Sequence, residues 1–241
     1  MKYAVTLTPG GIIPRDPKLT IRMQRAQPDA ETITTQLPAP VVSTMLLANF
    51  SGTGTLNGYT CDTGQTFAMY DGDGALADYA LDGSGQLLSV DHGVTWAFVS
   101  AAVSPSQHVY ACEAPAQIIS GPGNTNVRLA AIKTATNTYL VQLDLDCDFA
   151  GNFTAGCYVA TDNYADDLYS ELIPVALTVG ERYVLGFSVS DAGTVFTVNN
   201  VAIGSTPLKP DVLPTLFGFV NGQTGGLSVQ TLDYVKFAGV A

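Results

Sequence analysis

The segment from residue 139 to 148 shows the clearest pattern in the chain, an alternation of apolar and polar side chains over ten residues. A period of two residues is the pattern of a β-strand with one buried and one exposed face. The predicted inward face carries Tyr139, Val141, Leu143, Leu145 and Cys147, and the outward face carries Gln142, Asp144, Asp146 and Asp148. Because such a strand needs a second layer to cover its apolar face, the segment favours a layered β protein.

The rest of the chain from residue 49 onward repeats a pattern of strand, turn and strand. Residues 183–189 alternate in the same way, Asp191–Gly193 predicts a turn, and Thr194–Val198 predicts the returning strand of a hairpin. A dozen or so segments of this kind are spaced as in a β-sandwich, and no window keeps a helical period of about 3.6 residues. We therefore predict an all-β fold, an antiparallel β-sandwich over residues 49–241 with less than about a tenth of helix.

Residues 1–48 differ in composition from the remainder. They contain six of the 13 prolines, which interrupt strands and helices because proline lacks a backbone donor. They also carry five basic and three acidic residues, a net charge of +2, whereas residues 49–241 carry five basic and 18 acidic residues, a net charge of −13. We predict an extended, proline-rich N-terminal arm for anchoring or assembly, with folding back along its own domain as the alternative.

The charge and hydropathy of the chain narrow the classes of partner. A body with a net charge of −13 repels phosphate, so we expect no nucleic-acid partner. No apolar run approaches the roughly 20 residues that span a bilayer, and no apolar leader of about 7–15 residues follows Met1. We expect a protein made in a cytoplasm, with no membrane insertion.

The segment from Asn49 to Phe67 carries a phrase that resembles a known family. The phrase is aromatic-x-Gly, then Leu-x-Gly-x-x-x-Asp-x-Gly-x-x-aromatic, and it is occupied by Phe50, Gly52, Leu56, Gly58, Asp62, Gly64 and Phe67. It is similar to the first strand and turn of concanavalin A-like (laminin-G-like) jelly-roll domains of tailed-phage virion proteins. Residues 181–201 resemble a later hairpin of the same fold, so the resemblance covers about 49–241.

The resemblance implies a structural role rather than catalysis. We expect a non-enzymatic virion protein, either a capsid decoration or a tail appendage, located in the virion and forming a homo-oligomer. Its arm would bind other virion proteins through apolar side chains of two short strands and the residues between them, Tyr3, Val5, Leu7, Ile12, Ile13, Leu19, Ile21 and Met23. The first rival is a carbohydrate-binding module that adheres to host surface glycans.

The second rival is a glycoside hydrolase built on Asp144, Asp146 and Asp148. Carboxylates at alternate strand positions stand about 6.6–6.8 Å apart on one face, and jelly-roll glucanases use a similar phrase, Glu-x-Asp-x-Glu. Glycoside hydrolysis needs a pair of carboxyl groups on either side of the scissile bond. No tryptophan lies near this phrase, and aspartate is one methylene shorter than glutamate. We therefore favour a solvated face or strand end for these residues, with a cation site as a further alternative.

Two loops are weaker candidates for binding. Asp71-Gly-Asp-Gly74 resembles half of a calcium loop, but calcium takes six to eight oxygen ligands, so we favour an ordinary turn and expect no cofactor, with calcium as the alternative. The segment 162–169 mixes acids and tyrosines, and Tyr164, Asp166 and Tyr169 are candidates for glycan contact because tyrosine supplies contact area at low entropy cost. An acidic surface loop is the alternative.

The four cysteines, Cys61, Cys112, Cys147 and Cys157, include no Cys-x-x-Cys pair, and the two histidines are not spaced for zinc. In a protein without an export signal we expect four buried thiols. Cys147 and Cys157 are the pair most able to form a disulfide, because they could face each other across a hairpin.

Overall fold

The computed structural model describes residues 42–71, 75–89, 98–118, 124–134, 138–162, 167–224 and 230–241. The chain divides into residues 1–39, which lie outside the described residues, and one compact unit from residue 40 to the C-terminus. The regular secondary structure of its described residues is nearly all strand, and the helical content there is one short 3-10 helix at Leu76–Asp78. The prediction of an all-β fold is confirmed.

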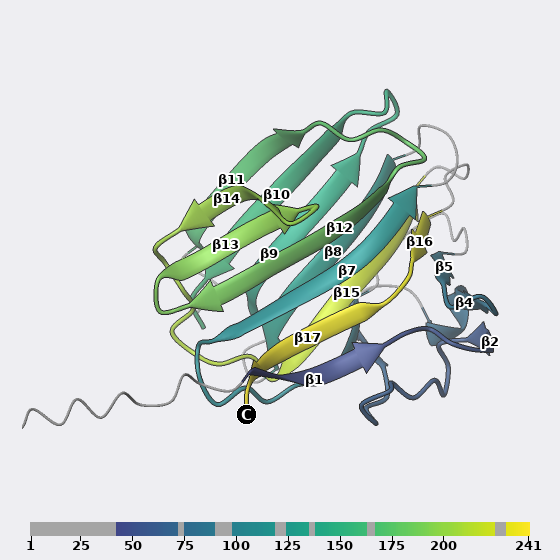
Figure 1. Cartoon of the computed structure of the whole chain (residues 1–241), viewed down its shortest axis with the longest axis horizontal. Helices are drawn as coiled ribbons and strands as arrows, with labels where there is room; N and C mark the ends of the chain where they lie inside the picture. Colours follow the sequence, from purple (N-terminus) through teal and green to yellow (C-terminus); the bar gives the residue numbers. More distant parts are fainter. Residues whose placement is uncertain are drawn as a thin grey trace, which may run out of the picture. The chain divides into compact units, whose positions relative to one another are not determined.

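The strands form two antiparallel sheets that lie one behind the other (Figure 1). The ten-stranded sheet contains β1 (Val42–Ala48), β2 (Thr53–Thr55), β4 (Tyr79–Asp82), β5 (Leu87–Ser89), β7 (Tyr110–Ile118), β12 (Arg182–Ser190), β13 (Gly193–Val198), β14 (Val201–Thr206), β16 (Gln230–Leu232) and β17 (Val235–Val240). The seven-stranded sheet contains β3 (Ala68–Asp71), β6 (Phe98–Ala102), β8 (Asn124–Lys133), β9 (Thr138–Cys147), β10 (Phe153–Ala160), β11 (Asp167–Val175) and β15 (Leu216–Thr224).

The order of the strands shows a sandwich with many crossovers. The seven-stranded sheet runs β11-β10-β9-β8-β15-β6-β3, and the other sheet runs β14-β13-β12-β7-β16-β5-β4-β2. One edge of β7 pairs first with β16 and then with β17, because the chain breaks its ladder at Asp233 and Tyr234. β17 in turn pairs with β1, so the last strand of the chain joins the first described strand to the sheet.

One apolar core fills the space between the sheets. It is built from the inward-facing side chains of both layers, and its largest fully buried members include Tyr110, Tyr183, Phe187, Phe196, Phe217, Phe219 and Phe237. The alternation that we read in residues 183–189 is confirmed, because Tyr183, Leu185, Phe187 and Val189 are all buried. β13 follows as the partner of β12, as expected for a hairpin.

The glycine-rich phrase around residues 50–67 does not form the first strand of the sheet. β1 precedes it, within the segment that we assigned to the arm, and pairs with β17 from Val42 opposite Val240. The phrase itself supplies the short strand β2 and a turn in which Asp62 Oδ2 accepts a hydrogen bond from the Asn49 amide at 2.9 Å. Its aromatic ends are structural, because the rings of Phe50 and Phe67 both pack against Phe219 in the core.

The hairpin of β9 and β10 corrects one cysteine alternative. Cys147 lies opposite Phe153, and Cys157 lies opposite Leu143, so the two thiols stand on different rungs of the ladder. The turn at residues 148–152 fixes this register, and a disulfide between these positions would need the strands to slide. All four cysteines are buried free thiols.

Candidate functional site

The outer face of the seven-stranded sheet gathers the chemically active side chains. β9 lies between β10 and β8, and its inward residues Val141, Leu143, Leu145 and Cys147 are buried in the core. The alternate residues Gln142, Asp144 and Asp146 therefore point to the outer face. Neighbouring strands add Asn126 and Arg128 from β8, which lie opposite Asp146 and Asp144.

Asp144 is the most unusual group on this face. Its side chain is only 6% exposed, and the Nε atom of Arg128 lies 3.3 Å from its Oδ2 atom. Gln142 Nε2 donates a hydrogen bond to the same oxygen at 2.9 Å. The other oxygen, Oδ1, is buried and has no hydrogen-bond partner among the residues that the structure describes. One oxygen of this carboxyl group is thus held by two partners, and the other is buried with its hydrogen-bonding capacity unused by the described residues.

Burial controls the protonation of Asp144. Loss of solvation raises the pKa of Asp144 to about 7, and the neighbouring charge of Asp146 adds to the increase. Arg128 and the hydrogen bond from Gln142 act in the opposite direction but do not cancel the effect of burial. A carboxyl group with a pKa near 7 can donate a proton near neutral pH, which an ordinary aspartate cannot do.

The two other aspartates of the phrase have different surroundings. Asp146 is half-buried and accepts a hydrogen bond from Asn126 Nδ2 at 2.6 Å. Asp148 lies beyond the end of β9, where its Oδ1 atom accepts hydrogen bonds from the amides of Ala150 and Asn152, both at 2.8 Å. Hydrogen bonds from Asn152 lower the pKa of Asp148. Our favoured interpretation of a solvated face is therefore wrong for Asp144, and Asp148 is a turn residue.

An aromatic and aliphatic cluster continues the same face beyond Gln142. The rings of Phe98 and Tyr139 are 4.8 Å apart, and Tyr70 packs edge-on against Tyr139 at 5.9 Å. The remaining members are aliphatic side chains from β8 and β15, namely Ala130, Ile132, Leu216 and Val220. Tyr70, Tyr139 and Leu216 remain partly exposed, so this cluster offers an apolar surface beside the carboxyl groups.

A β-bulge places Tyr139 on this face. The alternation alone predicted Tyr139 inward, on the same side as Val141, and this prediction is wrong. The register between β8 and β9 shifts between Ala131 and Ile132, so that Ile132 pairs with Tyr139 while Ala131 pairs with Val141. A bulge adds one residue to a strand and re-aims the side chains that follow it.

Sequence reasoning missed Arg128 and the aromatic cluster. The cluster comes from β3, β6 and β9, which lie far apart in the chain, so no spacing in the sequence could reveal it. Arg128 could have been identified from the sequence, because it is the first basic residue after Arg25 and lies in the otherwise apolar stretch 127–132. A lone arginine in such a strand indicates a buried acidic partner.

The other predicted contact residues are only partly described. Tyr164 and Asp166 lie outside the described residues, as do all the apolar arm residues between Tyr3 and Met23. Tyr169 packs against the core edge, where its ring stacks on Phe196 at 6.1 Å and its hydroxyl group hydrogen-bonds with Glu171. The predicted binding of partner subunits through the arm stays a prediction.

The candidate calcium loop is also only partly described, because Gly72, Asp73 and Gly74 lie outside the described residues. Across the described part of the chain, no group of three or more His, Cys, Asp or Glu side chains is placed to hold a metal ion. Within the same part of the chain, no helix is long and apolar enough to cross a membrane.

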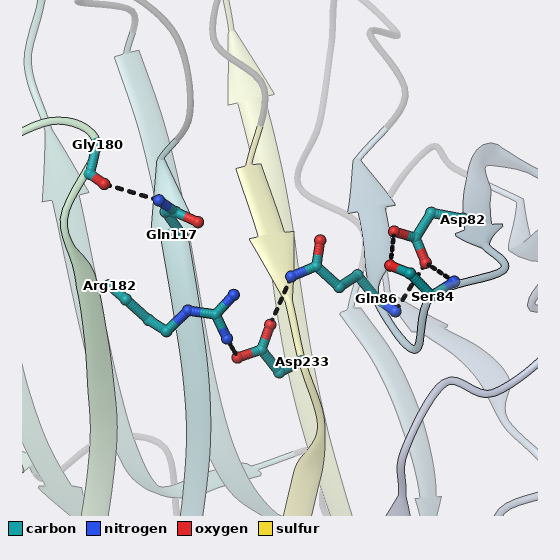
Figure 2. A network of polar contacts seen from close by, with 7 residues as sticks. All are labelled: Asp82, Ser84, Gln86, Gln117, Gly180, Arg182 and Asp233. Carbon is teal, nitrogen blue, oxygen red and sulfur yellow. Dashed lines mark hydrogen bonds and ion pairs between the residues drawn. The ribbon is translucent and has the colours of Figure 1, made fainter.

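The ten-stranded sheet carries a second polar network, in which the contacts serve the structure. Asp233, between β16 and β17, forms an ion pair with Arg182 through Oδ2 and accepts a hydrogen bond from Gln86 Nε2 through Oδ1 at 2.8 Å (Figure 2). Gln117 Nε2 donates to the carbonyl of Gly180 at 2.7 Å in the same network (Figure 2). The contacts of Asp233 connect the segment between β16 and β17 to the turn after β4 and to the start of β12.

Comparisons with known proteins support the fold. No family model matches the chain, and no curated protein matches its sequence. Among solved structures, the chain is similar to an immunostimulatory antigen and pseudo β-1,3-glucanase of Mycobacterium tuberculosis, at 13% identity and a TM-score of 0.58, with 82% of this chain and 100% of that chain covered. It is also similar to a non-specific endo-β-1,3(4)-glucanase of family GH16, at 11% identity and a TM-score of 0.58, over 84% of this chain and 95% of that chain.

A third similar structure is the β-glucanase of Bacillus licheniformis, at 9% identity and a TM-score of 0.54, over 78% of this chain and 97% of that chain. The fold is therefore the concanavalin A-like jelly-roll β-sandwich, as the resemblance implied. The phage context finds no support. The prediction of a non-enzymatic virion component is contradicted, because the similar structures include endo-β-glucanases and endo-acting O-glycanases. A short glycine-rich phrase marks a turn of the fold and carries no information on the setting in which the fold is used.

Proposed function

We propose that the protein is a glycoside-hydrolase-like protein that binds an extended glycan across the outer face of the seven-stranded sheet. The observation that carries the proposal is the placement of Asp144, a buried carboxyl group with a raised pKa, on the same face as Asp146 and a partly exposed aromatic cluster. Sugar rings present apolar faces that pack on aromatic side chains, and their hydroxyl groups need polar partners. The fold shared with β-glucanases supports a β-glucan as the first substrate class to test.

In the proposed reaction, Asp144 donates its proton to the oxygen that leaves the anomeric carbon. Asp146 is the second carboxylate of the pair, and it either takes a proton from the attacking water or bonds to the anomeric carbon itself. Arg128 and Gln142 hold Asp144 in place through Oδ2, which leaves Oδ1 without a protein hydrogen bond among the described residues and so able to accept or donate one to the substrate. The anomer first released reports which role Asp146 has, because direct attack by water inverts the configuration and a covalent intermediate retains it.

The test measures binding and cleavage separately on the full-length protein. Calorimetry and reducing-end assays with laminarin, lichenan and mucin O-glycans cover the substrates that the neighbouring folds suggest. We expect cleavage to fall by about 100-fold or more in Asp144→Asn, as for loss of a general acid, with binding retained. Asp148→Asn is the matched control, because Asp148 lies in a turn beyond β9 and should leave cleavage unchanged.

The outcomes separate the parts of the proposal. Binding without cleavage would contradict the catalytic role of Asp144 and leave the glycan-binding face in place. A protein that neither binds nor cleaves any of these glycans would contradict the proposal as a whole.

A further inference from the structure

A glycine and a tyrosine on β10 lie directly beside Asp144. Gly156 pairs with Asp144 across the ladder, and Tyr158 pairs with Gln142 one rung further along the same face. The ring of Tyr158 leans back over Gly156, since a β-carbon built on that glycine would lie 2.7 Å from Tyr158 Cε2 and 2.8 Å from its hydroxyl oxygen. Gly156 is buried although it belongs to the outer face, and the tyrosine ring accounts for its burial.

This position of the ring places it beside Asp144 on the side of β10. In an antiparallel pair, side chains directly opposite each other start about 4.5–5.5 Å apart, so a ring that rests on Gly156 stands next to the Asp144 carboxyl group. Arg128 closes the side toward β8, and Gln142 and Asp146 flank the carboxyl group along β9. The charged or titratable groups that face Asp144 are thus Arg128, Asp146 and Tyr158, with the Cys157 thiol on the inner side of β10.

We propose that Tyr158 is a movable cover for Asp144, whose ring rests on Gly156 without ligand and moves off it when a glycan binds. The proposal rests on the function proposed above and gives it a positioning residue. In the covered state Asp144 Oδ1 is buried with no hydrogen-bond partner among the described residues. A substrate oxygen or hydroxyl group reaches this atom only after the ring moves, and then supplies the missing hydrogen bond.

The chemistry of the covered state favours such a movement. A buried polar atom without a partner is unfavourable, so a ligand that satisfies it gains free energy. Gly156 has no side chain, so it holds the ring of Tyr158 only through backbone contact. The ligand therefore binds the uncovered state more tightly than the covered state, and this difference in affinity drives the displacement of the ring.

The experiment measures the pKa of Asp144 by NMR of its labelled carboxyl carbon in four variants. Tyr158→Ala removes the cover, and Gly156→Ala displaces the ring while keeping the tyrosine. Both should lower the pKa of Asp144 by about one unit or more, because water then reaches the carboxyl group. Tyr158→Phe keeps the ring and should leave the pKa near its wild-type value. Gly218→Ala, a glycine replacement on β15 of the same sheet, is the control for a general disturbance.

A folded Tyr158→Ala or Gly156→Ala protein with an unchanged Asp144 pKa would overturn the covering role. The second measurement adds a β-1,3-gluco-oligosaccharide to wild-type protein and follows the ring signals of Tyr158. Binding that leaves these signals unchanged would overturn the movement. If the pKa shifts as expected but no oligosaccharide binds, the cover is supported and the proposed glycan function is what fails, so the two failures are distinguishable.

Discussion

Both sheets carry an arginine–aspartate pair, but the two pairs use their carboxyl groups differently. On the ten-stranded sheet, Asp233 has a partner for each oxygen, Arg182 on one and Gln86 on the other (Figure 2). On the seven-stranded sheet, Arg128 and Gln142 both meet the same oxygen of Asp144, and the other oxygen has no hydrogen-bond partner among the described residues. The arginines differ as well, because the side chain of Arg182 is 51% exposed and that of Arg128 is 17% exposed.

The difference shows how one pair of residue types serves two purposes. A satisfied and partly solvated pair holds strand ends together at little cost and has no capacity left for a ligand. A buried pair in which one carboxyl oxygen lacks a hydrogen bond is unfavourable for folding. Such a feature is expected where a ligand supplies the missing hydrogen bond. The comparison therefore favours the seven-stranded sheet as the functional face.

The largest expected contrast comes from removing the arginines. Arg128→Met should lower the free energy of unfolding by about 3–5 kcal/mol at pH 8, because it leaves a buried carboxylate without its countercharge. Arg182→Met should lower it by about 1 kcal/mol or less, because the side chain of Arg182 is 51% exposed and Asp233 keeps its hydrogen bond from Gln86. Urea denaturation of both variants measures the contrast, and equal losses would show that burial does not separate the two pairs.

The pH dependence of stability tests the protonation of Asp144. Between about pH 4 and pH 7 the unfolded chain ionises this group while the folded protein keeps it protonated, so wild-type stability should decrease as the pH rises through this window. Asp144→Asn removes that dependence. Relative to wild type, the free energy of unfolding of Asp144→Asn should therefore rise by about 2–4 kcal/mol between pH 4 and pH 7. Urea denaturation at a series of pH values gives the curve, and parallel curves for the two proteins would contradict the raised pKa.

Glycan affinity tests the aromatic end of the outer face. Tyr139→Ala should weaken binding of a β-gluco-oligosaccharide about tenfold, or by about 1.4 kcal/mol, because it removes a partly exposed ring from the proposed binding surface. Tyr234→Ala, on the ten-stranded sheet, removes a tyrosine whose hydroxyl donates to Glu113 at 3.1 Å and should leave affinity unchanged. Calorimetry on both variants gives the comparison, and a loss confined to Tyr234→Ala would move the site to the other sheet.

The smallest effect is expected in the structural network. Gln86→Ala removes one hydrogen bond to Asp233 at the turn between β4 and β5 and should lower the free energy of unfolding by about 0.5–1.5 kcal/mol. Glycan affinity should not change in this variant. A measurable change in affinity would mean that the network on the ten-stranded sheet is coupled to binding.

The sequence was sufficient for the class of the fold and for many strands. The alternation in residues 183–189 predicted β12 and its buried face, and the Asp-Ala-Gly turn predicted the return in β13. The three aspartates of residues 144–148 were also singled out as the carboxyl groups of a rival glycoside hydrolase, although a solvated face or strand end was favoured. Their roles could not be ranked, because a period of two residues gives the same face to Asp144, Asp146 and Asp148 and says nothing of what covers each one.

Two local features explain the remaining differences. The bulge beside Ile132 reversed the direction of Tyr139, and a bulge depends on how two strands pair, which neither strand encodes alone. The function inferred from the glycine-rich phrase was wrong because those glycines and aromatics specify a turn and core packing. Residues with such a local role specify the fold and carry no information on the function for which it is used.

By itself, the sequence determined that this chain forms antiparallel strands with one apolar face each, because side-chain alternation acts over neighbouring residues. It also determined that the body is acidic and that Asp144 stands on the polar side of its strand. Only the tertiary structure decided that Arg128, Gly156 and Tyr158 surround Asp144, because long-range pairing brings β8 and β10 to either side of β9. Burial is a property of that assembly, and burial is what gives Asp144 a pKa of about 7 and makes the outer face of the seven-stranded sheet the candidate site.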